Sequence, residues 1–404
     1  MSTLVERERV LSGMRPTGRL HLGHYHGVLK NWVQLQSKYD SFFFVADWHA
    51  LTTHYDDPGI MSGHVWDMVI DWLAAGIDPN QATLFIQSRL PQHAELHLLL
   101  SMVTPLGWLE RVPSFKDQQQ RLKNRDLATY GFLGYPLLQS ADILMYRARW
   151  VPVGQDQVPH VELTREIARR FNHIFGKDFE YESKVEMISS KLGKKMARKF
   201  LTARQAWQQN GDLIAQQLAR DTLENSQNLS FEEKESLIGY LEGGGRTILV
   251  EPEALLTRAS KLPGLDGQKM SKSYKNTISM RDDPDRVAGA IRTMPTDPAR
   301  KRRDDPGEPD KCPVWELHQI YTEEKVREQL ALGCRSAGIG CLDCKEPLID
   351  SVIDEQTLLH DKARPYKDDP QQVRAIIEDG CARAEVIVEE TLNTVRQAVG
   401  TIYT

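Results

Sequence analysis

The stretch VLSGMRPTGRLHLGH, residues Val10–His24, joins an apolar run, a glycine-rich turn and the start of a helix. Val10–Met14 is typical of a buried strand, and we expect a helix to begin near His24. A helix N-terminus presents unpaired N–H groups and a partial positive charge. Glycines at positions 18 and 23 let a nucleotide approach the backbone closely. The stretch therefore predicts a phosphate-binding turn after the first strand of a sheet.

The two histidines of this stretch, His21 and His24, lie three positions apart on one edge of the expected helix. There they can donate hydrogen bonds to negative charge that develops on a phosphate. Taken alone, a His-x-x-His pair is more often an ordinary surface pair, so its meaning depends on the rest of the chain.

Strands and helices alternate through the first 176 or so residues. This alternation predicts an α/β fold, a Rossmann-like parallel sheet with helices on its faces. The further segments that follow the pattern are the strand-like runs Phe42–Ala46, Thr83–Gln87 and Val151–Val153, and the helical stretches His24–Ser37, Gly63–Ala75 and Pro159–Phe171.

The rest of the chain divides by its composition. Residues 177–249 are rich in Gln, Glu, Lys and Ala and predict a helical insertion, after which residues 250–295 continue the domain of residues 1–176. Residues 296–404 are expected to be mostly helical. Apolar positions at three and four spacing from Gln371 onward indicate core packing.

A second chemical signal is PGLDGQKMSKS, Pro263–Ser273. Lys269 and Lys272 are a mobile pair of positive charges on a loop that two glycines loosen. Such a loop can close on a triphosphate and follow its charge as pyrophosphate leaves. The similar string GKKMA, Gly193–Ala197, lacks the serine and the second lysine, so we assign it to the insertion.

The composition narrows the classes of protein to which this chain can belong. The 404 residues, 40% hydrophobic and 26% charged, indicate a globular protein of two or more domains. A net charge of -5 excludes bulk attraction to nucleic acid, although Lys191–Lys199 and Arg300–Arg303 are candidate local RNA-binding faces. We find no apolar run of membrane-spanning length and no signal-peptide core in MSTLVERERV, so we expect a cytoplasmic protein without membrane contact.

Four of the five cysteines follow the spacing Cys312-x21-Cys334-x6-Cys341-x2-Cys344. In a chain expected in the cytosol, such a cluster indicates a metal centre rather than disulfides. Four thiolates suit tetrahedral zinc or a cubane iron–sulfur cluster, and the spacing alone does not choose between them. Cys381 stands apart on a helical stripe and is expected in the core.

Together and in this order, His21–His24 and Lys269–Ser273 resemble the HIGH and KMSKS signatures of class I aminoacyl-tRNA synthetases. The resemblance is to the tryptophanyl branch and covers nearly the whole chain apart from the insertion. It implies ATP-dependent activation of L-tryptophan and transfer to the 2′-hydroxyl of the terminal adenosine of tRNA(Trp), with residues 296–404 as the anticodon-binding domain. The resemblance to the tryptophanyl branch also rests on the segments Ser12–Gly18, Asp47–Thr52, Gly134–Pro136, Ala141–Leu144 and Val151–Gln157.

The resemblance also implies residue roles. Asp142 accepts a hydrogen bond from the indole N–H, Tyr135 and Gln157 hold the substrate ammonium, and His49 holds the carboxylate. Phenylalanine would leave that Asp142 carboxylate unpaired, and the penalty favours tryptophan; the alternative for Asp142 alone is a helix cap. Gln139 departs from the methionine of many bacterial relatives. The implied catalytic residues are His21, His24, Lys269 and Lys272, and the implied ATP-binding residues are Arg15, Pro16, Thr17, Gly23, His24, Gly154, Asp156, Lys269, Met270, Ser271, Lys272 and Ser273, with Mg²⁺ on the phosphate oxygens.

A subgroup of bacterial tryptophanyl synthetases carries a [4Fe–4S] cluster beside the anticodon-binding region. The segments CPVW from Cys312 and GCLDCK around Cys341 and Cys344 look like its ligand segments, which favours this cluster, with Cys334 as the fourth ligand, over Zn²⁺. The resemblance implies a homodimer. The rival assignments are a tyrosyl-tRNA synthetase and a catalytically silent paralogue that binds RNA.

Overall fold

The computed structural model describes residues 7–57, 59–112, 129–176, 179–243, 247–256 and 262–403. Five parallel strands form one sheet in the order β3-β2-β1-β4-β5. The expected α/β fold is therefore confirmed, with one strand, β5, that the sequence did not predict. The strands are β1 (Arg9–Met14), β2 (Asp40–Val45), β3 (Ala82–Ile86), β4 (Trp150–Val153) and β5 (Glu253–Leu256).

Both faces of the sheet are buried. In β2, Phe42 and Phe44 enter one core and Phe43 and Val45 the other, because successive side chains of a strand point to opposite faces. The Trp32 ring stacks on Phe43 with 4.3 Å between ring centroids. Burial on both sides explains why this strand reads as a continuous apolar run.

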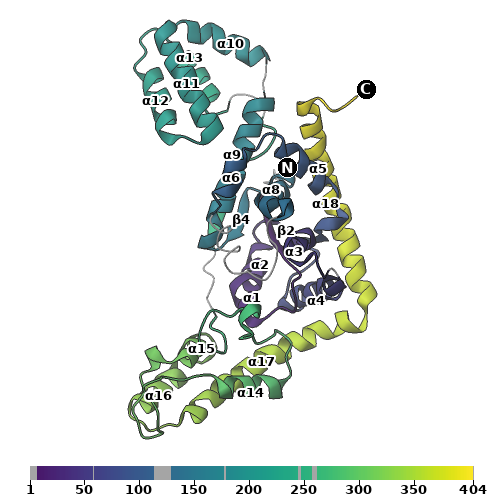
Figure 1. Cartoon of the computed structure of the whole chain (residues 1–404), viewed down its shortest axis with the longest axis vertical. Helices are drawn as coiled ribbons and strands as arrows, with labels where there is room; N and C mark the ends of the chain where they lie inside the picture. Colours follow the sequence, from purple (N-terminus) through teal and green to yellow (C-terminus); the bar gives the residue numbers. More distant parts are fainter. Residues whose placement is uncertain are drawn as a thin grey trace, which may run out of the picture.

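Separate sets of helices cover the two faces (Figure 1). The α2 and α4 helices pack on one face, and α5, α8 and α9 on the other. The strand order reverses between β1 and β4, and in open α/β sheets ligands bind at the carboxyl ends of strands at such a point. The helices here are α1 (Leu22–His24), a π-helical turn (Tyr25–Leu29), α2 (Lys30–Leu35), α3 (Asp47–His54), α4 (Gly59–Ala75), α5 (Gln92–Ser101), α6 (Leu106–Glu110), α8 (Tyr130–Met145) and α9 (Val158–Phe175).

A helical group stands away from the sheet at one end of the molecule (Figure 1). It has its own apolar core, in which Phe200 and Leu237 are fully buried. Arg169 of α9 lies over the Trp207 ring at 4.5 Å and joins the group to the sheet. The boundaries 177 and 249 stay predictions, and residue 177 lies outside the described residues. The group comprises α10 (Phe179–Ser190), α11 (Lys194–Asn210), α12 (Leu213–Glu224) and α13 (Phe231–Leu241).

The C-terminal helices gather at the opposite end and then return along the sheet (Figure 1). Leu22 and Met270, from the two phosphate motifs, share a core with α14, α15 and α17. The last helix, α18, packs on β3, where a Cβ at Gly380 would collide with the carbonyl oxygen of Leu84. Across the described residues, every helix is too short or too polar to cross a bilayer. These helices are α14 (Pro284–Thr293), α15 (Pro313–Tyr321), α16 (Glu324–Arg335), α17 (Cys341–Asp368) and α18 (Pro370–Val399).

A polar cluster joins the C-terminal helices to the turn that follows the two motif histidines. Glu355 of α17 accepts hydrogen bonds from Lys30 at 2.9 Å and from the Tyr321 hydroxyl at 2.9 Å, and its other contact is His26 Nε2 at 2.8 Å. His26 belongs to the π-helical turn, a departure from regular helix that often marks a functional site. The helices at this end are thus tied by hydrogen bonds to the phosphate-binding segment.

Candidate active site

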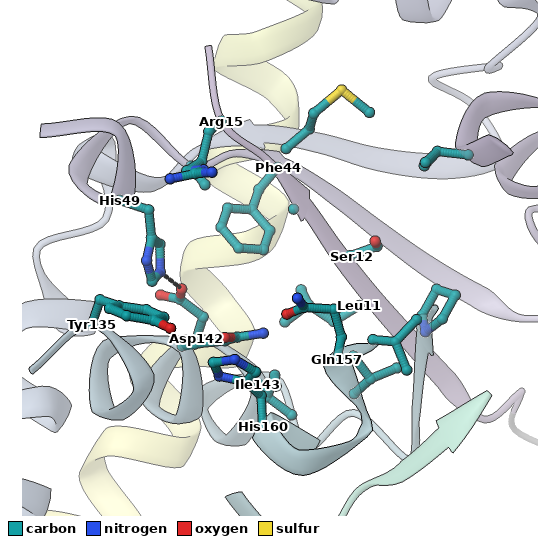
Figure 2. A pocket seen from close by; sticks show the side chains of 18 of the residues that line it. Leu11, Ser12, Arg15, Phe44, His49, Tyr135, Asp142, Ile143, Gln157 and His160 are labelled. Carbon is teal, nitrogen blue, oxygen red and sulfur yellow. Dashed lines mark hydrogen bonds and ion pairs between the residues drawn. The ribbon is translucent and has the colours of Figure 1, made fainter. Parts of the chain in front are cut away.

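A cavity of about 460 Å³ opens at the carboxyl ends of β1 and β4, where the strand order reverses (Figure 2). Its walls come from segments that are far apart in the chain. The predicted site residues that line it are Arg15, Thr17, His24, His49, Tyr135, Asp142, Gly154 and Gln157. The structure therefore brings the expected amino acid residues and part of the expected ATP set into one space.

Asp142 is the buried acid of this cavity, with 1% of its surface exposed. Its Oδ2 lies 2.7 Å from His49 Nε2, while its Oδ1 lies 2.7 Å from His93 Nδ1 and accepts from Gln87 Nε2 at 2.8 Å. Burial alone would raise the pKa of Asp142, but its hydrogen bonds and electrostatic interactions with His49 and then His93 outweigh burial and lower the pKa to about 2. Asp142 is thus an ionised acceptor held within the last turn of α8. The helix-cap alternative is wrong, because Thr129 caps that helix.

The residues expected around the amino acid backbone have different positions in the cavity. Tyr135 projects from α8 beside Asp142, with its ring centroid 5.7 Å from that of His160, and Gln157 approaches from the opposite wall (Figure 2). The Gln139 side chain also lines the space. His49, expected to hold the substrate carboxylate, pairs with Asp142. The substrate roles of these residues stay predictions.

The two motif histidines occupy the other end of the site. Their ring centroids are 3.8 Å apart, and the His21 backbone N–H donates to His24 Nδ1 at 3.3 Å, which leaves His24 Nε2 as the donor. The pKa of His21 is lowered to about 4 by burial and then by Lys272, and burial also lowers the pKa of His24 strongly. Both rings are therefore neutral near pH 7. His24 lines the cavity, whereas His21 is packed behind it.

The loop that carries Lys269 and Lys272, called the lysine loop below, lies directly against the glycine-rich turn. Lys272 Nζ donates to the carbonyl oxygen of Gly18 at 2.7 Å, whereas Lys269 is exposed. A Cβ at Gly23 would lie 2.9 Å from His21 Nδ1, so glycine permits the His21 ring to pack this close to the backbone. Lys272 therefore stands near both histidines. The other expected ATP contacts, Pro16, Asp156 and Ser271, do not line the cavity, and the side chain of Ser273 lies outside what the structure describes.

The four clustered cysteines are free and lie in one region. Burial, together with the nearby Cys312, Cys334 and Cys341, raises the pKa of the Cys344 thiol to about 12. Arg300 Nη1 lies 3.9 Å from Cys334 Sγ. Over the described part of the chain, no group of three or more His, Cys, Asp or Glu side chains is arranged to hold a metal ion. The expected metal centre is therefore not shown.

Comparison with known proteins identifies the family to which this chain belongs. The model described as tRNA synthetases class I (W and Y) matches residues 5–198 and 217–355. The tryptophan–tRNA ligase of Ralstonia nicotianae is 62% identical over 396 residues, which are 98% of this chain and 99% of the relative. That of Thermotoga maritima is 40% identical over 397 residues, 98% of this chain and 100% of the relative. A structure of tryptophanyl-tRNA synthetase from Campylobacter jejuni, complexed with ADP and tryptophan, has a TM-score of 0.72 at 26% identity, covering 97% of this chain and 99% of that one.

The chain therefore belongs to the class I tRNA synthetases for tryptophan and tyrosine. Within that class it is a member of the tryptophan–tRNA ligase family, as its relatives at 62% and 40% identity show. The predicted branch is thus confirmed.

Sequence reasoning missed three residues that organise the site. Gln87 follows directly after β3, and a polar residue at the carboxyl end of a parallel strand is a usable signal. His93 lies in an apolar helix and carries no such signal. Asn276 is buried within the lysine loop, where it donates to Asp266 at 2.7 Å and accepts from the Ser271 N–H at 2.7 Å.

Proposed function

We propose that this protein activates L-tryptophan with ATP and transfers it from tryptophanyl-adenylate to the 2′-hydroxyl of the terminal adenosine of tRNA(Trp). The observation that carries the proposal is one cavity with an ionised, buried Asp142 at one end and neutral His24 at the other. The similar Campylobacter jejuni enzyme, complexed with ADP and tryptophan, supports it.

For the amino acid, we propose that Asp142 accepts the indole N–H while Tyr135 and Gln157 hold the ammonium. His49 would then leave Asp142 and meet the substrate carboxylate. A carboxylate with a site for one more donor favours indole over a phenyl ring, which leaves that site unpaired.

For ATP, the proposal places the phosphates between the turn of Arg15–Thr17, the His24 ring and the lysine loop. The tryptophan carboxylate attacks the α-phosphorus and pyrophosphate leaves, so no protein nucleophile is needed. His24 donates a hydrogen bond to the developing charge, and Lys269 and Lys272 follow the departing pyrophosphate. Mg²⁺ would be held by phosphate oxygens.

The test is amino acid-dependent exchange of pyrophosphate into ATP, measured with tryptophan, tyrosine and phenylalanine. We expect exchange with tryptophan alone. Exchange with tyrosine would support the tyrosyl alternative, and no exchange by folded protein that still binds tRNA would support the silent paralogue.

For the rest of the chain, we propose the division into residues 1–176 with 250–295 as catalytic domain, 177–249 as insertion and 296–404 as anticodon-binding domain. We also propose a cytoplasmic homodimer. The last helix, α18, packs on the sheet, so anticodon contacts are expected from α14, α15, α16 and the part of α17 that packs with them.

We further propose that Cys312, Cys334, Cys341 and Cys344 hold a [4Fe–4S] cluster, with Zn²⁺ as the alternative. Four free cysteines in one region are a suitable donor set for either. The group would supply structural cross-links and takes no part in the reaction. Iron, sulfide and zinc analysis of anaerobically purified protein distinguishes them: about four irons and four sulfides indicate the cluster, and one zinc in a colourless sample the alternative.

A further inference from the structure

The two oxygens of Asp142 have different surroundings. Oδ2 lies on the cavity side and has His49 Nε2 as its partner at 2.7 Å. Oδ1 points away from the cavity and is held by His93 Nδ1 at 2.7 Å and Gln87 Nε2 at 2.8 Å. Both of these partners are 0% exposed. One oxygen is therefore fixed inside the protein, and the other faces the ligand space.

His93 is itself fixed from its other side. Its Nε2 lies 2.9 Å from the Tyr146 hydroxyl, and its ring centroid lies 5.5 Å from that of Tyr146 and 6.2 Å from that of Phe85. Burial and the nearby Asp142 raise the pKa of Tyr146 well above its usual value, so the hydroxyl keeps its proton. Because Nδ1 faces a carboxylate and carries the ring proton, Nε2 accepts from that hydroxyl.

We infer that His93, held by Tyr146, is a positioning residue that, with Gln87, fixes Asp142 Oδ1 and so leaves Oδ2 to exchange His49 for the indole N–H of the substrate. The inference deepens the proposed function and rests on it. It also accounts for a His49 that pairs with Asp142 and is proposed to meet the substrate carboxylate.

The physical reason is orientation. A carboxylate offers about four lone-pair sites, and those of Oδ1 are taken by His93 and Gln87. Without these anchors the carboxylate can rotate about its Cβ–Cγ bond and point a lone pair wherever a donor happens to lie. Discrimination against a substrate without an N–H then falls, because the unpaired site can turn away.

The test compares tryptophan with 3-benzothienylalanine, in which sulfur replaces the indole N–H, in pyrophosphate exchange by the full chain. His93→Leu should lower kcat/KM for tryptophan by about tenfold to a hundredfold and leave the value for the analogue almost unchanged. His93→Asn places an amide donor at the position of Nδ1 and should restore most of the discrimination. Tyr146→Phe should give a smaller loss of the same kind.

The control is Tyr39→Phe, at a half-buried tyrosine of the other core. It should change kcat/KM for neither substrate. Equal losses for both amino acids in all three variants would mean a structural role and overturn the inference. If His93→Leu fails to fold, Tyr146→Phe and His93→Asn decide by the same ratio. Absence of tryptophan-dependent exchange in the wild-type protein would instead contradict the proposed function itself.

Discussion

Lys272 Nζ donates a 2.7 Å hydrogen bond to the carbonyl oxygen of Gly18, a residue 254 positions earlier in the chain. The lysine loop and the glycine-rich turn are therefore in contact. A backbone carbonyl carries only partial negative charge, so a triphosphate is the stronger partner for this ammonium. Binding of ATP is expected to draw Lys272 from Gly18 onto phosphate.

This lysine predicts an alkaline limit to ATP use. Burial lowers the pKa of Lys272 to about 8. The nearby Asp71 raises this pKa and Arg15 lowers it, but burial is the largest effect. Lys272 is charged below that pH and loses its charge above it, so kcat/KM for ATP should be level below pH 8 and fall above. In Lys272→Arg, kcat/KM for ATP should not fall above pH 8, because a guanidinium stays charged. If kcat/KM for ATP falls above pH 8 in this variant as in the wild type, another group causes the fall.

The lysine loop depends on Asn276, which bonds Asp266 and Ser271 at 2.7 Å each. Asn276→Ala should lower kcat for pyrophosphate exchange by about tenfold or more while KM for tryptophan stays the same, since removing these bonds loosens the loop and not the amino acid pocket. Asn80→Ala, at an exposed turn, is the control. A change in KM for tryptophan would show that the loop also shapes the pocket.

The polar cluster around Glu355 predicts a stability effect. Glu355→Gln keeps the size of the side chain but removes the charge that His26, Lys30 and Tyr321 share. The free energy of unfolding in urea should fall by about 1–3 kcal/mol. Glu162→Gln, which breaks an exposed pair with Arg165, should cost less than about 1 kcal/mol. Equal small losses would mean that the cluster adds no stability.

Gly380 predicts a packing effect at the contact of α18 with β3. A Cβ there would collide with the carbonyl oxygen of Leu84, which belongs to a strand and cannot move freely. Gly380→Ala should therefore destabilise the protein by about 1–3 kcal/mol, measured as a lower Tm. Gly289→Ala in α14 is the matched control, because nothing lies within 4 Å of its Cβ position, and alanine there should be neutral or stabilising. A Tm for Gly380→Ala at or above that of the control would contradict this account.

Four strands of the sheet could be predicted because their residues are buried on both faces and read as short apolar runs, as in Asp40–Val45. The fifth, Glu253–Leu256, could not, since this edge strand is half exposed and its residues EALL favour helix in isolation. The expected helix His24–Ser37 exists, but the π-helical turn Tyr25–Leu29 within it has no sequence signal.

Motifs mark Asp142 and His24, which line one cavity, and Lys272, which lies against the glycine-rich turn, while the roles of all three stay predictions. The anchors behind Asp142 could not be predicted, because the role of His93 follows from a contact 49 residues away that local patterns do not encode. The pairing of His49 with Asp142 was likewise missed, because these residues lie 93 positions apart and no local pattern encodes the contact.

The proposed mechanism makes Asp142 the residue that selects tryptophan for transfer to tRNA. The most direct test of this role is charging of tRNA(Trp) with tryptophan by the wild-type chain and by Asp142→Asn, with KM for ATP measured alongside. We predict that the wild type charges the tRNA and that the variant loses about a hundredfold or more in kcat/KM for tryptophan, with KM for ATP unchanged. Equal charging by both proteins would contradict the claim.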